Sequence, residues 1–251
     1  MFSAFFSSFI YNPLYNSLVF LINHAPYADV GIAIILLTCA VKLVLLPLAH
    51  TAVRSQIMMN AIKGDLDAIR EKYKNDKQKQ AQHTMALYKE KNINPFAMIL
   101  PLLIQIPIIF GLYWVFFRGG LPNINTDLLY GFIPLPESVN MQFIGLIDMG
   151  GKSVALALFA GITQYIQAKL AFPKLEARAE QSSFKDDLAR SMHLQMRYVL
   201  PIIVGVIAYT ISAAVALYWT TSNIFAIGQE IFVRRKLLKR AENNHTHHGN
   251  I

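Results

Sequence analysis

The chain has 251 residues, of which 54% are hydrophobic and only 15% are charged, whereas a soluble domain carries about 25% charged residues. Its single cysteine, Cys39, excludes an internal disulfide framework and a cysteine-based zinc site. The net charge of +8 would suit nucleic acid, but DNA-binding domains are not so poor in charge. The composition therefore indicates an integral membrane protein and excludes a secreted scaffold and a disordered chain.

Residues 1–28 contain no Lys, Arg, Asp or Glu. After Asn12-Pro13, one face of a helix would carry Asn16 and Asn23, and another would carry the apolar residues Leu14, Leu18, Leu21 and Ile22. This pattern predicts an amphipathic segment on the outer surface of the membrane. A short additional span and an atypical cleaved signal peptide are the alternatives, because a basic n-region and a clear cleavage site are both missing.

Five apolar stretches are candidates to cross the bilayer, for which about 20 residues are needed. They are residues 30–49, 94–117, 154–170, 198–212 and 216–233. The last two form one run of 36 residues, which as a single helix would be about 54 Å long. Since that is too long for one crossing, we predict two spans joined by a tight turn near residues 212–216.

The basic residues are distributed unevenly along this pattern. Residues 51–93 hold nine Lys and Arg, residues 169–197 hold six, and the tail after Val233 holds five. With five spans, 20 of the 23 basic residues lie on one side, Arg118 and Lys152 lie on the other, and Lys42 lies inside the membrane. The positive-inside rule then predicts an outside N-terminus and a cytoplasmic C-terminus.

Between the spans, residues 51–91 are polar and helix-prone. Asn75-Asp76 indicates a turn, and the stretch predicts a cytoplasmic helical hairpin whose apolar stripe is Met58, Ile62, Leu66, Ile69 and Tyr73. Its charges suit a solvated face, or contact with anionic lipid, a ribosome or a targeting factor. The loop 118–153 predicts an irregular outer connection without a domain of its own, and residues 241–251 predict a polar cytoplasmic tail.

No catalytic pattern stands out in the sequence. It contains no HExxH motif, no glycine-rich phosphate loop and no intramembrane pair of aspartates, and the histidines of the tail are too loosely arranged for a metal site. We therefore predict a protein that is not an enzyme and that uses neither a cofactor nor a metal.

Lys42 is the informative residue, because a charge at a helix centre costs about 2.5–3.5 kcal/mol on insertion scales. It can snorkel toward the cytoplasmic interface, or it can face a wet cavity inside the bundle. The only carboxylate in the predicted spans, Glu230, is placed to pair with Arg234 at i+4. We therefore expect Lys42 to meet water or a transient anionic partner. Polar residues of the other spans either line the same cavity or bond between helices: Gln105, Gln164, Gln167, Thr220, Thr221, Ser222, Asn223 and Gln229.

Three motifs resemble those of the YidC-type (YidC/Oxa) family of bacterial membrane-protein insertases. The most specific begins with Leu87-Tyr88-Lys89-Glu90 and Asn94-Pro95 and continues through Pro101-Leu102-Leu103-Ile104-Gln105-Ile106-Pro107 to Leu112-Tyr113. The end of the first span, Val41-Lys42-Leu43-Val44-Leu45-Leu46-Pro47-Leu48, resembles the first core helix of the family. The start of its last helix is similar to Leu217-Tyr218-Trp219-Thr220-Thr221-Ser222-Asn223. The resemblance extends from about Phe9 to Arg240.

The resemblance implies an all-α polytopic membrane protein, with a five-helix core at residues 29–240 and a membrane-embedded hydrophilic groove open to the cytoplasm and to lipid. A basic residue in the first core helix draws in the polar tail of a client, and Lys42 falls on that position. Thr38, Tyr218 and Trp219 match groove-side positions, Gln164 or Gln167 would supply a polar wall, and Gln105 and Asn223 complete the expected groove. The implied partners are nascent integral membrane proteins, the lipid bilayer, a ribosome and the general secretion channel, with no DNA. The implied location is the bacterial plasma (inner) membrane.

Two departures from the family are visible. The family usually has Arg where this chain has Lys42, which offers a compact point charge instead of a planar fork of donors. The chain also looks like a minimal form, without a large extracytoplasmic domain or a lipid-anchor cysteine. Two other functions compete with insertion: a small ion- or solute-conducting transporter with Lys42 as its site charge, and an assembly factor that holds partner helices without a groove.

Overall fold

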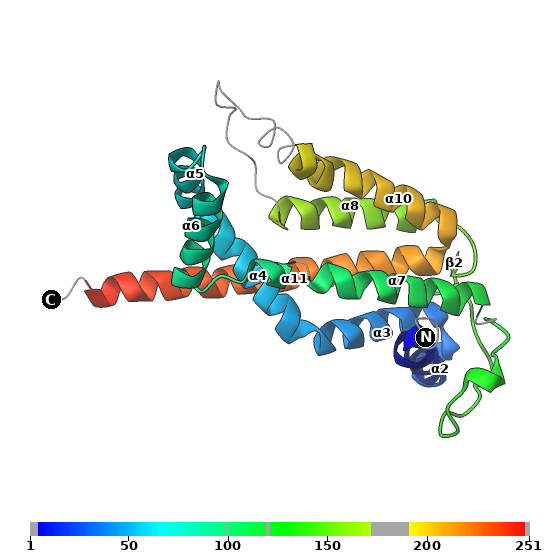
Figure 1. The fold of residues 1–251 in the computed structure, drawn as a ribbon. Helices are drawn as coiled ribbons and strands as arrows, with labels where there is room; N and C mark the ends of the chain where they lie inside the picture. Colours follow the sequence, from blue (N-terminus) through cyan, green and yellow to red (C-terminus); the bar gives the residue numbers. More distant parts are fainter. Residues whose placement is uncertain (1–4, 99, 119–120, 172–190, 249–251) are drawn as a thin grey trace. The chain divides into compact units, whose positions relative to one another are not determined.

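The computed structural model describes residues 5–98, 100–118, 121–171 and 191–248 (Figure 1). Within these residues it is helical apart from the connections and one two-stranded sheet. The chain divides into two compact units. The first unit contains residues 1–44 and 105–227, and the second contains residues 45–104 and 228–251.

The first unit begins with a π-helical turn, η1 (Ser7–Tyr11), and continues as α2 (Asn12–His24), a single turn η2 (Pro26–Ala28) and α3 (Val30–Val44). Of the predicted apolar face, Leu14, Leu18 and Ile22 are buried and Leu21 is partly buried, and α2 contacts α3. The predicted location of this segment, on the outer surface of the membrane that the chain spans, stays a prediction.

The asparagine face of α2 is not a solvent face either. Asn16 is buried, and its Nδ2 donates to the carbonyl of Leu128 at 2.8 Å while its Oδ1 accepts from the Tyr130 amide at 2.7 Å. Asn23 Nδ2 donates to the carbonyl of Pro134 at 2.8 Å. The connection around the short turn η4 (Thr126–Leu128), between α7 and α8, is therefore bound to α2.

The same connection contains the antiparallel strands β1 (Gln142–Phe143) and β2 (Ile147–Asp148). Asp29 fixes this hairpin to the start of α3, because its Oδ1 accepts from the Ile32 amide at 3.1 Å and its Oδ2 from the Ile144 amide at 2.8 Å. Gly31 is required beneath it, since a Cβ there would lie 2.3 Å from the Phe143 ring.

The remaining helices of the first unit are α8 (Val154–Ala171), α10 (Leu200–Ile211) and parts of α7 (Leu100–Arg118) and α11 (Ala213–His248). A π-helical turn, η5 (Gln195–Val199), leads into α10. Helices α8 and α10 lie side by side (Figure 1) and pack closely through small residues. Gly161 and Gly205 face each other there, with a Cβ on Gly161 3.3 Å from the carbonyl of Pro201.

The predicted turn between the last two spans is a single residue. Ser212 has extended backbone angles between α10 and α11, and its Oγ accepts from the Val215 amide at 3.4 Å. A serine that caps the next helix can therefore end one helix and start another without a longer loop.

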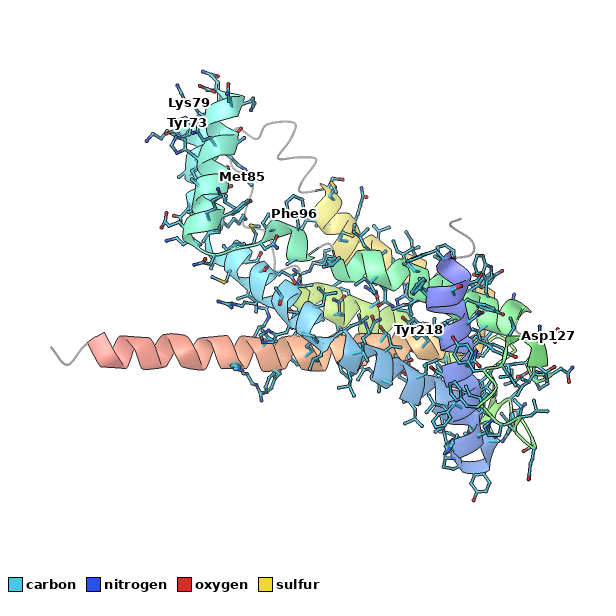
Figure 2. The ribbon with its side chains drawn as sticks, turned by 60° about the horizontal axis from the view of Figure 1, so that its bottom comes forward. Tyr73, Lys79, Met85, Phe96, Asp127 and Tyr218 are labelled. Atoms are coloured by element: carbon cyan, nitrogen blue, oxygen red, sulfur yellow. The ribbon has the colours of Figure 1, made fainter. Side chains whose placement is uncertain are left out.

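The second unit consists of α4 (Leu46–Ala61), α5 (Lys63–Lys72), α6 (Lys77–Glu90) and a short turn η3 (Pro95–Met98), together with the end of α11. Its core is formed by Ile62, Leu66 and Ile93, with Met58, Met59, Leu87 and Tyr88 packed around them. Helices α5 and α6 form the hairpin, and Figure 2 shows Tyr73 and Lys79 together at the end where they are joined.

Four helix limits differ from the limits of the predicted segments, which themselves stay predictions. The first span, predicted at 30–49, is interrupted at Leu45, because the Pro47 ring cannot fit a continuous helix four residues after the Leu43 carbonyl. The hairpin predicted at 51–91 starts later, since residues 51–61 belong to α4. Residues 95–98 precede α7 as a separate 3₁₀ turn, and α11 continues past the predicted end of its span at 233 to His248.

Two helices among the described residues are long and apolar enough to cross a membrane, at Val154–Ala171 and Ser191–Ile211. A third is obtained if α3 and α4 are counted as one bent span. The predicted number of five spans stays a prediction.

Candidate functional site

Lys42, in the last turn of α3, joins a hydrogen-bonded chain that crosses three helices. Its Nζ donates to Oε1 of Gln105 on α7 at 3.2 Å, and Nε2 of Gln105 donates to the hydroxyl of Tyr218 on α11. Tyr218 is buried, and Lys42 and Gln105 are half-buried. Three residues that are 63 and 113 positions apart in the sequence are thereby connected.

The contact adds a resident partner that the sequence did not predict for Lys42, a neutral amide oxygen, and the expected water or transient anionic partner stays a prediction. An amide orients the ammonium without cancelling its charge. In the described part of the chain, no carboxylate forms an ion pair with Lys42. The predicted pairing of Glu230 with Arg234 is confirmed, with Oε1 and Nη2 2.8 Å apart.

A second polar contact connects α11 with α8. The indole Nε1 of Trp219 donates to Gln164 Oε1 at 3.3 Å, and Gln164 Nε2 donates to Gln167 Oε1 at 3.4 Å. Trp219 follows Tyr218 directly, and consecutive residues on a helix point in different directions. Helix α11 therefore presents polar groups toward α7 from one residue and toward α8 from the next.

The last two predicted site residues, Asn223 and Thr38, have partners outside the Lys42 chain. Asn223 is buried, and its Nδ2 donates to Thr163 Oγ1 at 3.3 Å, which is an interhelical bond of the structural kind. Thr38 is buried, and its hydroxyl donates to the Ile34 carbonyl of its own helix at 2.7 Å. Neither residue joins the Lys42 chain through these bonds.

Sequence reasoning named Gln105 and Tyr218 separately, but it missed the bond between them and the role of Thr163. A signal was present for Thr163, which lies four residues before Gln167 on the helix and so on the same side. For Gln105 and Tyr218 no local pattern relates the two residues, since only packing of α7 against α11 brings them together.

The exposed faces of α8 and of its neighbour α10 are apolar. Exposed side chains include Leu158 and Ile162 on α8 and Ile202 and Val206 on α10. Contiguous apolar surface of this kind is not tolerated in water, but it matches the acyl chains of a bilayer. Polar side chains between helices and apolar ones outside indicate a membrane protein. No group of His, Cys, Asp or Glu suited to a metal ion is present among the residues that the structure describes.

Comparison with known proteins agrees with this arrangement. A family described as 60Kd inner membrane protein has a model that matches residues 21–240. The chain belongs to this family. Its membership confirms the resemblance to YidC-type insertases and identifies the chain as an all-α inner membrane protein.

Three relatives, each named Membrane protein insertase YidC, illustrate the range of the 60Kd inner membrane protein family. One from Clostridium tetani is 34% identical over 95% of this chain and 91% of its own length. One from Fusobacterium nucleatum is 31% identical over 91% of this chain and 98% of its own length. One from Methylobacillus flagellatus is 31% identical over 84% of this chain but only 33% of its own length. The similarity to the first two relatives covers nearly the whole length of this chain and of each relative.

Proposed function

We propose that this chain is a membrane protein insertase that helps integral membrane proteins enter and fold in the bacterial inner membrane. The names of its relatives support the general activity. For the mechanism, we propose that a client's polar tail enters a cytoplasm-open groove beside Lys42 and that its apolar segment then moves into lipid. Thr38, Gln105, Gln164, Gln167, Tyr218, Trp219 and Asn223 are the proposed groove residues.

The physical problem for an insertase is the polar tail of its client. Backbone groups that cross hydrocarbon without partners cost several kcal/mol each. A wet half-channel shortens the dry path, and a cation inside it attracts acidic side chains more strongly than in bulk water. Such a mechanism needs no covalent step and no nucleotide, so we propose that the protein is not an enzyme.

The observation that carries this proposal is the contact between Lys42 and Gln105. Because the amide is neutral, it does not neutralise the ammonium as a carboxylate partner would, and an incoming carboxylate can take that role. The Lys42 Nζ lies 3.2 Å from Oε1 of the half-buried Gln105. The side chain therefore extends sideways toward α7 and not along the axis of α3. A lysine that only snorkelled would extend toward the headgroups.

The first test replaces Lys42 in proteoliposomes that synthesise a client with an acidic translocated tail. We expect Lys42→Ala to reduce insertion several-fold, Lys42→Arg to preserve it, and a client with a neutral tail to be affected much less. Lys169→Ala is the matched control, because it removes the same charge from an exposed lysine near the end of α8. Equal insertion of both clients by Lys42→Ala would contradict the role of the charge.

Crosslinks from the site separate insertion from the two alternatives. A photo-crosslinker at Thr38 or Trp219 should capture a ribosome-bound nascent membrane protein, with the exposed Ile202 of α10 as the comparison position. Crosslinks confined to outer positions such as 202 would support an assembly factor that holds partner helices without a groove. Ion flux through client-free liposomes that depends on Lys42 would support a transporter. Contacts with the ribosome and the general secretion channel are proposed as partners of the same activity.

A further inference from the structure

Five large apolar side chains are exposed in two segments of the first unit, the turn η2 between α2 and α3 and the connection between α7 and α8. Tyr27 is 92% exposed, Leu146 83%, Phe132 80%, Ile144 67% and Leu135 56%. We refer to them as the tip cluster. They lie outside the predicted spans and outside the proposed client site, so neither the core nor the mechanism accounts for them.

Two members of the tip cluster occupy backbone positions that do not suit them. Ile144 and Gly145 have φ values of 53° and 71°, the left-handed pair that a type I′ hairpin turn requires. Asn or Asp is the usual residue at the first position, and a β-branched side chain there is strained. Tyr27 has a φ of 57°. Exposed apolar side chains that are held in an unfavourable backbone indicate a function for the side chain itself.

The segments that carry these tips are anchored to the ends of the helices. Asp29 accepts from the Ile144 amide, and the Asn140 amide donates to the Ala28 carbonyl at 3.0 Å. At the other end of the hairpin, the Ala213 amide donates to Gly151 at 2.8 Å and the Ala214 amide donates to Met149 at 3.1 Å. The hairpin and the turn at Tyr27 are therefore held near the starts of α3 and α11, whereas Phe132 and Leu135 lie beside Tyr130 and Pro134, which bond to Asn16 and Asn23 of α2.

A neighbouring pair marks this level as the edge of the bilayer. Lys152 places its Nζ 5.6 Å from the centre of the Tyr209 ring, next to the exposed apolar start of α8 at Val154. Tyrosine and a snorkelling lysine are typical of the interface between hydrocarbon and headgroups. Leu146 is three residues from Met149, at most about 10 Å along the strand. The interfacial layer is roughly 5–8 Å thick on each side of the core, so the tips can reach it.

We propose that the tip cluster is a lipid-binding surface that enters the interfacial layer of the leaflet on the side of this connection. The occupant is the headgroup and upper acyl region of phospholipids, because the five side chains are apolar and exposed and because the connection that carries four of them ends at the Lys152–Tyr209 pair and the exposed apolar start of α8. The connection would thus be an anchored cap on the ends of the spans, in place of a solvated linker. This proposal does not rest on the proposed insertase activity.

The test uses the single native cysteine. In a Cys39→Ala background, a nitroxide label is attached to Leu146→Cys and, separately, to Phe132→Cys, and the purified full chain is placed in phosphatidylethanolamine–phosphatidylglycerol vesicles. Asp127→Cys and Gln142→Cys are matched controls, because both are exposed polar positions in the same connection (Figure 2 shows Asp127 within it). Collisions with oxygen, which concentrates in lipid, are compared with collisions with a water-soluble nickel complex.

We expect labels at 146 and 132 to favour oxygen several-fold more than labels at 127 and 142. Equal nickel accessibility at all four positions would overturn the proposal, since the tips would then be in water. Shielding of 146 and 132 from both reagents would also overturn it and would identify a protein partner, such as a second copy of the chain. Quenching of Leu146→Trp by brominated lipids, relative to the parent chain, repeats the measurement without a label.

Discussion

At the scale of single residues, the most informative feature is a cation whose partner is an amide. A carboxylate at position 105 would hold Lys42 just as firmly, but it would neutralise the charge within a medium of low dielectric constant. Glutamine fixes the position of the ammonium and leaves its charge available. The identity of residue 105 therefore decides whether the resident partner of Lys42 is neutral or opposes its charge.

Gln105→Glu would place a carboxylate directly beside the Lys42 ammonium. The new carboxylate should pair with Lys42 and reduce insertion of clients with acidic tails several-fold, close to the level of Lys42→Ala. Gln105→Met, which removes the acceptor but keeps the charge, should have a smaller effect. The measurement is protease protection of the translocated tail in proteoliposomes. Insertion of acidic clients at the parent level by Gln105→Glu would show that a free charge at Lys42 is not needed.

At the scale of secondary-structure elements, caps and prolines decide where the helices begin and end. Ser212 separates α10 from α11, Pro47 separates α3 from α4, and Asp76 caps α6. Each acts through a backbone group that would otherwise be unsatisfied or through a proline ring that a helix cannot accommodate. The Asn75-Asp76 pair predicted the turn before α6. The break at Leu45 was not predicted, because it lies inside an apolar run.

The cap of α6 predicts a pH dependence. Asp76 Oδ1 accepts from the Lys79 amide at 3.0 Å, and this bond holds the pKa of the Asp76 carboxyl below its ordinary range. The cap's contribution is therefore complete above about pH 4, near the pKa of a free aspartate, and is lost as the pH falls through the lowered value. Hydrogen exchange of residues 77–82, corrected for intrinsic rates, should accelerate over that range. Asp76→Asn keeps a side-chain oxygen that can accept the bond but has no carboxyl group to titrate. Its hydrogen exchange should therefore show no acceleration over this pH range.

Small residues between α8 and α10 predict a packing limit. Gly161→Leu would force its side chain against the Pro201 carbonyl and the facing Gly205, and overpacking of this kind costs about 1–3 kcal/mol. Thermal unfolding in detergent should therefore occur at a lower temperature. Gly228→Ala is the control, because nothing lies within 4 Å of its Cβ position and alanine favours a helix by about 0.5–1 kcal/mol. A stable Gly161→Leu protein would contradict close packing of the two helices.

At the scale of the whole molecule, the division of basic residues predicts a topology that accessibility can test. In a Cys39→Ala background, Asp127→Cys in the outer connection should react with a membrane-impermeant maleimide in intact cells. Met85→Cys in the hairpin should react only after lysis, although Met85 is itself exposed. Reaction of both positions in intact cells would contradict the predicted orientation, which places 20 of 23 basic residues in the cytoplasm.

The sequence by itself determined the class of the protein, the family and the residues of the candidate site, because these depend on composition, charge placement and short motifs. The tertiary structure decided which of these residues meet. Gln105 and Tyr218 have no relation in sequence that predicts their bond, and Asn16 looked like part of a solvated face until the 121–140 segment was seen to cover it. Contacts between distant segments depend on how the helices pack. A local pattern of residues therefore predicts that a face is buried, but it does not predict which segment covers that face.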